Sequence, residues 1–215
     1  MAVVLCFGDS LTWGYNPGTG TRLPAPDRWP NVLADALGPD VTVIAEGLNG
    51  RTTTVDSPFR AMRSGAAMLP ALLESHAPVD VVVIILGTND LQTALGLSAN
   101  YAASGIASLL DMVARSLAGP DRRSPRVLVV SPPHIMAPSG FVGVLWEGRE
   151  AESQRLADRY APVAAITGAA FFDAAAVVSP SIADGVHLDA AGQRILGIRL
   201  AAEVSALLDS ATDAS

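Results

Sequence analysis

Five short apolar runs, separated by stretches of helical periodicity, constrain the fold of this chain more than any other feature of its sequence. The runs are Val3–Phe7, Val41–Ala45, Val81–Leu86, Val127–Val130 and Ala170–Phe172. The first four are rich in Val, Ile or Leu and do not alternate with polar residues, as expected of strands that are covered by helices on both faces. The sequence therefore predicts an α/β fold with a central, mostly parallel five-stranded sheet.

The stretches between these runs have the spacing of helices. The expected helices are Trp29–Leu37, Gly65–His76, Tyr101–Leu117, Glu150–Ala165 and one that begins near Asp189. Asp27 is a candidate cap for the first of them, and Pro162 is expected to kink or end the fourth. No linker or internal repeat divides the chain, so we expect a single domain over residues 1–209 and a frayed tail over residues 210–215.

Composition excludes several classes of protein. The formal net charge is −7, whereas a nucleic-acid partner would require a basic face. No apolar run approaches the roughly 18 residues of a membrane helix, and the N-terminus lacks the basic segment of a secretion signal. Half of the residues are hydrophobic and only 16% are charged, which is compatible with burial between subunits. We expect a cytoplasmic homo-oligomer that binds neither nucleic acid nor membranes.

Four polar segments follow the predicted strands. They are "GDS" at Gly8–Ser10, "EGLNGRTT" at Glu46–Thr53, "LGTND" at Leu86–Asp90, and "DGVH" at Asp184–His187. Ligands of open parallel sheets bind beyond the carboxyl ends of the strands. The fold therefore predicts that these four segments, remote in sequence, meet at one edge of the sheet.

Ser10 is either a helix cap or a nucleophile, and a nucleophile needs a base. Three histidines are available. His76 ends a predicted helix, where a cation suits the helix dipole. His134 follows the fourth strand and stays a second candidate. His187 is preferred as the base because Asp184, three residues earlier, can orient its imidazole within one turn.

Attack on an ester also creates an oxyanion that needs hydrogen-bond donors. The backbone N–H groups of Ser10 and Gly50 and the side-chain amide of Asn89 are candidates at the same edge. Taken singly, Gly50 could as well be a turn residue as an oxyanion donor, and Asn89 could as well be a loop cap. Their joint placement favours the catalytic interpretation.

A metal site is the alternative use of the acidic residues. Asp9, Asp90, Asp184 and His187 are all expected near this edge. Metallophosphoesterase sites combine several histidines with their acids, and two of the three histidines here have no acid at ligand spacing. We therefore predict no metal.

The blocks "FGDSLTWG", "GRTT", "GTND" and "DGVH" resemble, in the same order, those of the SGNH (GDSL-type) hydrolases. The chain is most similar to the intracellular arylesterase and acyltransferase (perhydrolase) branch. The resemblance implies a three-layer αβα, flavodoxin-like fold without metal or other cofactor. It implies Ser10, Asp184 and His187 as the triad, and Ser10, Gly50 and Asn89 as the oxyanion hole. The partners implied are a small-molecule ester and an acyl acceptor, which is water, an alcohol or peroxide.

The pocket is expected to be apolar. The loop over residues 135–148, "IMAPSGFVGVLWEG", is too rich in glycine for a stable helix and carries costly exposed side chains such as Phe141 and Trp146. It should fold over the site as a lid, pack against another subunit, or pack onto its own domain. Trp13 is expected either to line the acyl pocket or to anchor the core.

These observations predict a serine esterase that hydrolyses short-chain aryl and alkyl esters and transfers the acyl group to alcohols or peroxide. The alternatives are a carbohydrate O-acetylesterase, a thioesterase or lysophospholipase of the same family, and a non-catalytic binding module. Low aromatic content, 5%, speaks mildly against a carbohydrate-binding groove.

Overall fold

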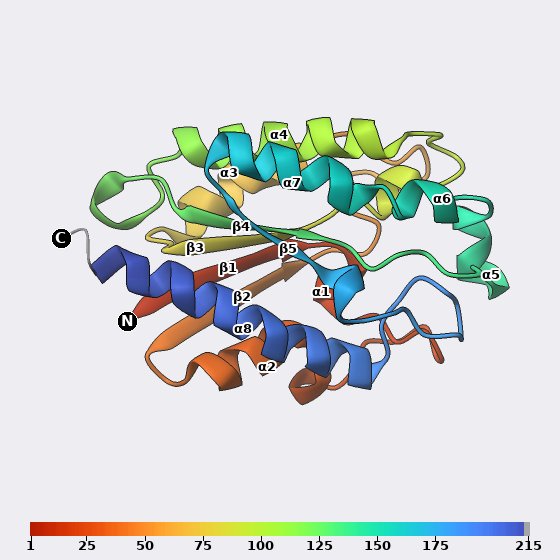
Figure 1. Ribbon diagram of the computed structural model, residues 1–215, viewed down its shortest axis with the longest axis horizontal. Coiled ribbons are helices and arrows are strands. Elements are labelled where there is room, and N and C mark those ends of the chain that lie inside the picture. The colour runs from red at the N-terminus through yellow and green to blue at the C-terminus, as the bar shows by residue number, and fades with distance from the viewer. Residues whose placement is uncertain (213–215) are drawn as a thin grey trace.

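The computed structural model describes residues 1–212 and has three layers, with one sheet between two layers of helices (Figure 1). The strands are β1 (Ala2–Gly8), β2 (Val41–Gly47), β3 (Val81–Ile85), β4 (Arg126–Ser131) and β5 (Ala170–Asp173). They form a sheet in the order β2-β1-β3-β4-β5, and every neighbouring pair is parallel. Each predicted run is a strand, and the predicted α/β fold is confirmed.

Long helices cover both faces of the sheet (Figure 1). One layer contains α3 (Gly65–His76), α4 (Ala99–Arg115) and α7 (Leu156–Thr167), and the other contains α2 (Trp29–Leu37) and α8 (Ala190–Thr212). Three further helices have a single turn: α1 (Ser10–Trp13), α5 (Gly140–Gly143) and α6 (Glu150–Ser153). No helix within residues 1–212 is both long enough and apolar enough to cross a membrane.

Strand β1 shows why the apolar runs are continuous. Leu5 and Phe7 pack into the core on the side of α3, α4 and α7, while Val4 and Cys6 pack into the core on the side of α2 and α8. Successive side chains of a strand point to opposite faces, and here both faces are dry. Burying one such side chain contributes about 1.5–3 kcal/mol, so no position in this strand favours a polar residue.

Two predicted helix boundaries were wrong. Asp27 does not cap α2; Arg28 holds the N-cap position, and the Asp27 carboxylate accepts a hydrogen bond from Arg194 Nε of α8 at 3.0 Å. Pro162 does not end its helix, since it lies inside α7; the break falls earlier, between α6 and α7. Burial of Tyr160 and Ala164 on one face of α7 outweighs the roughly 3 kcal/mol that an interior proline costs.

The predicted C-terminal tail begins within the last helix. Residues 210–212 belong to α8, whose described residues run to Thr212. The Arg126 guanidinium at the start of β4 donates to the Leu207 carbonyl at 3.0 Å, which ties the last turns of the helix to the sheet. The rest of the predicted tail, residues 213–215, lies outside the described residues.

Helix α4 approaches the loop after β2 closely at Gly105. A Cβ atom at this position would lie 2.0 Å from Thr53 Oγ1 and 2.5 Å from Thr53 Cβ. Thr53 is fully buried and belongs to one of the four polar segments that lead to the sheet edge. The absence of a side chain at residue 105 therefore allows the segment that carries Thr53 to pack directly against α4.

We expect Gly105→Ala to destabilise the protein by about 1–3 kcal/mol, although alanine is the better helix former, because the added methyl group overpacks against Thr53. Urea denaturation measures the free energy of unfolding. Ser104→Ala, on the exposed side of the same turn, is the control and should change it by less than about 0.5 kcal/mol. An alanine variant at least as stable as the wild type would contradict the close packing.

Candidate active site

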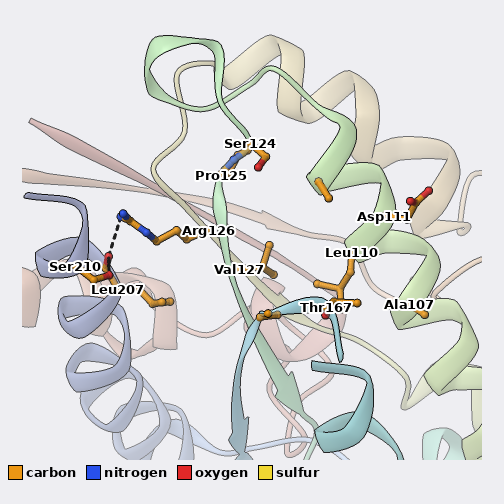
Figure 2. Close-up of a pocket in the computed structure, with 13 residues that line it drawn as sticks. Ala107, Leu110, Asp111, Ser124, Pro125, Arg126, Val127, Thr167, Leu207 and Ser210 are labelled. Atoms are coloured by element: carbon orange, nitrogen blue, oxygen red, sulfur yellow. Dashed lines mark hydrogen bonds between the residues drawn. The ribbon is translucent and has the colours of Figure 1, made fainter. Parts of the chain in front are cut away.

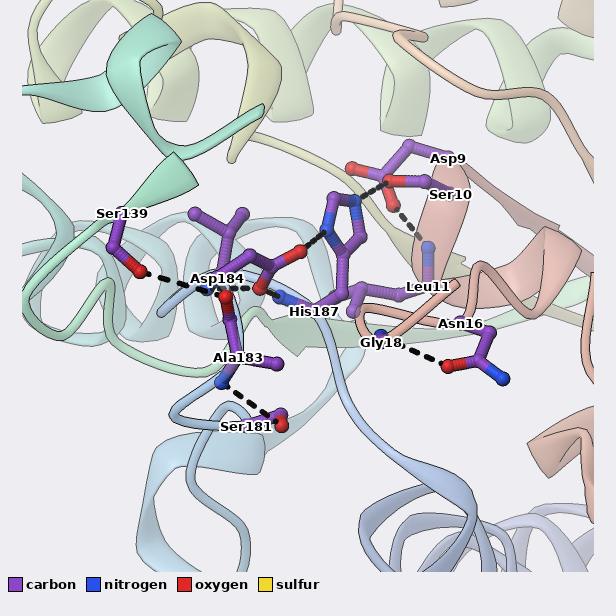
Figure 3. Close-up of polar contacts among 11 residues, drawn as sticks. Asp9, Ser10, Leu11, Asn16, Gly18, Ser139, Ser181, Ala183, Asp184 and His187 are labelled. Carbon is purple, nitrogen blue, oxygen red and sulfur yellow. Dashed lines mark hydrogen bonds and ion pairs between the residues drawn. The ribbon is translucent and has the colours of Figure 1, made fainter. Parts of the chain in front are cut away.

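Ser10 stands at the point where β1 ends and the single turn of α1 begins (Figure 3). The Asp9 carboxylate caps this turn by accepting a hydrogen bond from the Leu11 N–H at 2.9 Å. Ser10 is the first residue of the helix, so its own N–H has no partner within the helix. The short turn therefore holds both the hydroxyl and the amide of Ser10 at the carboxyl edge of the sheet.

A continuous hydrogen-bonded chain joins Ser10 to the segment before α8 (Figure 3). Ser10 Oγ lies 2.9 Å from His187 Nε2, and His187 Nδ1 lies 2.6 Å from Asp184 Oδ2. The other carboxylate oxygen of Asp184 accepts hydrogen bonds from the Val186 and His187 N–H groups, both at 2.9 Å. All three triad candidates are buried, and the structure brings them together as the sequence predicts.

The Asp184 carboxyl group stays ionised at this position. Burial alone would raise its pKa, but the hydrogen bonds and charge of His187 and the backbone N–H bonds outweigh burial, so the pKa is lowered. An ionised carboxylate at Nδ1 fixes the tautomer that leaves Nε2 free to accept a proton from Ser10.

Two aromatic rings hold the His187 imidazole in place. Tyr15 lies against it with ring centroids 4.2 Å apart, and Trp146 meets it edge-on at 6.3 Å. The Trp146 Nε1–H donates to the Thr88 carbonyl at 2.7 Å. Sequence reasoning missed Tyr15, because no periodic or motif signal marks a residue whose contact is made only by the folded chain.

Gly50 and Asn89 both line the same cavity as Ser10. Gly50 has φ of +81°, a conformation that favours glycine. Asn89 Nδ2 donates to Asp9 Oδ2 and to the Arg51 carbonyl, both at 3.0 Å. The amide nitrogen of Asn89 is therefore already engaged by two acceptors, and it can serve an oxyanion only by sharing one of these hydrogens.

Two fully buried carboxylates hold the loops together. Asp9 binds Asn89, and Asp90 accepts hydrogen bonds from the N–H of Thr53 at 3.0 Å and from its hydroxyl at 2.5 Å. Burial raises the pKa of each acid to about 6, although their hydrogen bonds and, for Asp9, the charges of His187 and Arg51 oppose the shift. Within residues 1–212, no group of three or more His, Cys, Asp or Glu side chains could hold a metal ion.

Arg51 is a second residue that sequence reasoning missed. Its buried guanidinium donates to the Gly8 carbonyl at 2.7 Å and to the Glu46 carbonyl, and it lies 4.3 Å from the centre of the Phe7 ring. Burial lowers its pKa to about 10. This cation ties the ends of β1 and β2 together beneath the loop that carries Gly50.

Three sequence candidates lie away from the site. Trp13 does not line the cavity, and the Arg22 guanidinium lies 5.1 Å from the centre of its indole. His76 pairs with Glu46 at 2.9 Å. His134 is half-buried after β4 and does not line the cavity. His187 is thus the histidine that reaches Ser10.

The cavity beside Ser10 has a volume of about 480 Å³. Its wall includes Phe141, Val142, Leu145 and Trp146 from the segment over residues 135–148. The prediction that this segment forms no helix was wrong: α5 and a 3₁₀ turn at Val144–Trp146 occur within it. Bonds from Trp146 to Thr88 and from the Thr93 N–H to the Leu145 carbonyl anchor it over the site. Phe141 stays 93% exposed.

A larger hollow of about 630 Å³ lies at the opposite edge of the sheet, between α4, α7 and the end of α8 (Figure 2). Its charged lining residues are Asp111, paired with Arg115 at 2.8 Å, and Arg126, bonded to the Leu207 carbonyl. The candidate nucleophile and base lie instead in the smaller cavity.

Comparison with known proteins places this site in a family. The GDSL-like lipase/acylhydrolase family matches residues 6–195. The chain belongs to that family. It is an esterase of the SGNH type, and the predicted resemblance to the arylesterase branch is confirmed.

Solved structures similar to this SGNH esterase cover nearly its whole length. The aryl esterase of M. smegmatis is 39% identical with a TM-score of 0.91, and the carbohydrate acetylesterase Est24 of Sinorhizobium meliloti is 36% identical with a TM-score of 0.92. Each comparison covers 96% of this chain and 100% of the other. A curated arylesterase of Vibrio mimicus is 42% identical over 90 residues, which span 40% of this chain and only 37% of that protein.

The raised pKa of Asp90 makes the stability of this SGNH esterase depend on pH. The folded state holds the Asp90 proton up to about pH 6, and the unfolded state releases it near pH 4. The contribution of Asp90 to the free energy of unfolding therefore falls as pH rises from about 4 through 6. From pH 5 to pH 7.5, this effect should lower the free energy of unfolding of the wild type by about 1–2 kcal/mol. Asp90→Asn should abolish this part of the pH dependence.

Urea denaturation of wild type and variant at the two pH values measures this difference. Asp35→Asn, which changes an exposed carboxylate on α2, is the matched control and should leave the pH dependence unchanged. A decline that is the same in the Asp90 variant and the wild type would show that this carboxyl group does not titrate in that range.

Proposed function

We propose that this chain is a serine esterase that hydrolyses short-chain acyl esters of aryl and alkyl alcohols through a covalent acyl-enzyme. The observation that carries the proposal is the unbroken Asp184–His187–Ser10 chain, buried at the cavity wall with contacts of 2.6 and 2.9 Å. The family membership and the arylesterase relatives support the same chemistry.

In the first step, Ser10 Oγ attacks the ester carbonyl while His187 Nε2 takes its proton. Asp184, hydrogen-bonded at Nδ1, stabilises the imidazolium that forms. The tetrahedral intermediate places its negative charge toward the N–H groups of Ser10 and Gly50 and the amide of Asn89. Removing one such donor typically costs on the order of 10²–10³ in rate.

In the second step, the alcohol leaves with the proton held by His187, and the acyl group stays on Ser10. Water, an alcohol or peroxide then attacks this acyl-enzyme by the reverse sequence of proton transfers. The apolar wall from Phe141 to Trp146 supports transfer to apolar alcohols, because it favours such acceptors over water at the acyl-enzyme. Small-molecule acceptors are thus the proposed partners.

A carbohydrate O-acetylesterase is the second candidate. The likeness to Est24 over 96% of this chain favours it, and the same triad would perform the reaction. The cavity also contains the polar side chains Asn49 and Gln92, which suit a hydroxylated alcohol. The Escherichia coli protein named thioesterase 1/protease 1/lysophospholipase L1 is 34% identical over only 40% of this chain. This match supports a thioesterase or lysophospholipase function less.

Ser10→Ala should lower kcat for p-nitrophenyl acetate by at least about 10³, because the members of a triad act as a unit. Initial rates measure kcat, and circular dichroism verifies the fold. Ser108→Ala, on the exposed face of α4, should keep wild-type activity. Full activity without the Ser10 hydroxyl would refute covalent catalysis at Ser10, whereas a wild type without esterase activity would leave a binding module as the better interpretation.

Acyl-chain length and acceptor separate the proposed activities. With p-nitrophenyl esters from C2 to C12, we expect kcat/KM to be highest at C2–C4, because the acyl chain must share a cavity of about 480 Å³ with the aryl group. With vinyl acetate and benzyl alcohol in water, benzyl acetate should form beside acetic acid. If acetic acid is the sole product, acyl transfer is excluded, and faster turnover of acetylated sugars than of aryl acetates would favour the second candidate.

A further inference from the structure

The wall of the cavity beside Ser10 differs in its charged residues from the protein as a whole. The chain carries a formal net charge of −7, yet the described residues that line the cavity include Arg60 and no Asp or Glu. The remaining lining is neutral or apolar, apart from His187. A negatively charged ligand therefore meets no carboxylate in this wall.

Arg60 points its charge at the loop that carries a proposed oxyanion donor. Its Nη1 lies 3.8 Å from the position that a Cβ atom on Gly50 would occupy, and Arg63 Nε lies 3.6 Å from the same position. Both guanidinium groups thus have a nitrogen atom within 4 Å of the Cβ position of Gly50. Arg60 is the one of the two that lines the cavity.

Neither of these two cations is part of an ion pair. None of the ion pairs formed by the described residues includes Arg60 or Arg63. The nearby Asp56 uses its Oδ1 to accept hydrogen bonds from the Arg63 and Ser64 N–H groups, at 2.5 and 3.1 Å. Arg63 Nη1 donates to the Ala61 carbonyl at 2.9 Å, whereas Arg63 Nε is buried without a hydrogen-bond partner. Arg60 is exposed and lines the cavity, so its guanidinium is available to a ligand.

We propose that Arg60 forms a subsite for a carboxylate on the substrate, so that this esterase prefers esters that carry a negative charge a few bonds from the reacting carbonyl. A guanidinium group matches a carboxylate with two parallel N–H···O bonds, which a neutral ester of the same shape cannot make. The apolar side chains Phe59, Phe141 and Leu145 of the same wall accommodate the carbon chain that bears the charge. This inference rests on the proposed esterase function.

The carboxylate can belong to the acyl group or to the alcohol, and two substrate pairs distinguish these sources. The acyl pair is p-nitrophenyl hemiglutarate and its neutral methyl ester, and the alcohol pair is 4-acetoxybenzoate and its neutral methyl ester. The measured quantity is the ratio of kcat/KM for the charged ester to that for the neutral ester, with wild type, Arg60→Gln and Arg60→Glu. Arg123→Gln makes the same change of charge at an exposed position before β4 and is the matched control.

In the wild type, we expect the charged member of at least one pair to be preferred, and 0.5 M salt to reduce that preference. Arg60→Gln should lower the ratio for that pair about 5- to 10-fold, and Arg60→Glu should lower it further. Neutral esters, which lack the carboxylate, should lose less activity than charged esters, and Arg123→Gln should leave every ratio unchanged.

Ratios that Arg60→Gln does not alter, or equal losses with charged and neutral esters, would overturn the subsite. The neutral esters also separate the two proposals. If they are turned over at full rate while the ratios do not respond to residue 60, the esterase function stands and the subsite alone fails. If the wild type turns over neither member of either pair, or if Ser10→Ala turns them over like the wild type, the esterase proposal itself fails.

Discussion

The arrangement of the candidate site at the carboxyl edge of the sheet depends on the burial of two carboxylates, Asp9 and Asp90. They lie at the ends of neighbouring parallel strands. A buried carboxylate is costly unless its oxygens accept hydrogen bonds. The chain meets this requirement with groups from elsewhere: the Leu11 N–H and Asn89 amide for Asp9, and Thr53 for Asp90. The loops after β1, β2 and β3 are thereby held to one another. The candidate nucleophile and all three proposed oxyanion donors belong to these segments, so the two buried acids help to position them.

The bond between Asp9 and Asn89 also affects how the oxyanion is stabilised. In the resting site, the Asn89 amide donates to Asp9 and to the Arg51 carbonyl, so its orientation is set before the substrate arrives. Gln92 Nε2 donates to Asn89 Oδ1 at 2.8 Å and so fixes which end of the amide is directed at Asp9 and Arg51. A donor oriented in advance needs little reorganisation when charge develops in the transition state. The same contacts mean that the oxyanion shares this donor with Asp9.

The sheet and the meeting of Ser10, Asp184 and His187 could be predicted from the sequence, whereas the supporting contacts could not. Strands buried on both faces leave continuous apolar runs, and parallel pairing places the segments that follow them at one edge. Ser10, Asp184 and His187 could then be chosen on chemical grounds. The failures have a common cause. Asp27 pairs with Arg194 of α8 instead of capping α2, Tyr15 stacks on His187, and Arg51 bonds to two strand ends. Each of these contacts joins residues that no local pattern relates.

The side chains of the segment over the cavity, residues 135–148, differ sharply in how much they support the fold. Trp146 is buried and bonded to the Thr88 carbonyl, so its loss would loosen the wall against which His187 rests. One turn earlier, the ring of Phe141 lies almost wholly in solvent while it still borders the cavity. Laboratory evolution can therefore randomise position 141 at little thermodynamic penalty and change which molecules enter, whereas truncation at position 146 would destabilise the fold, since loss of a buried Trp typically costs about 3–5 kcal/mol.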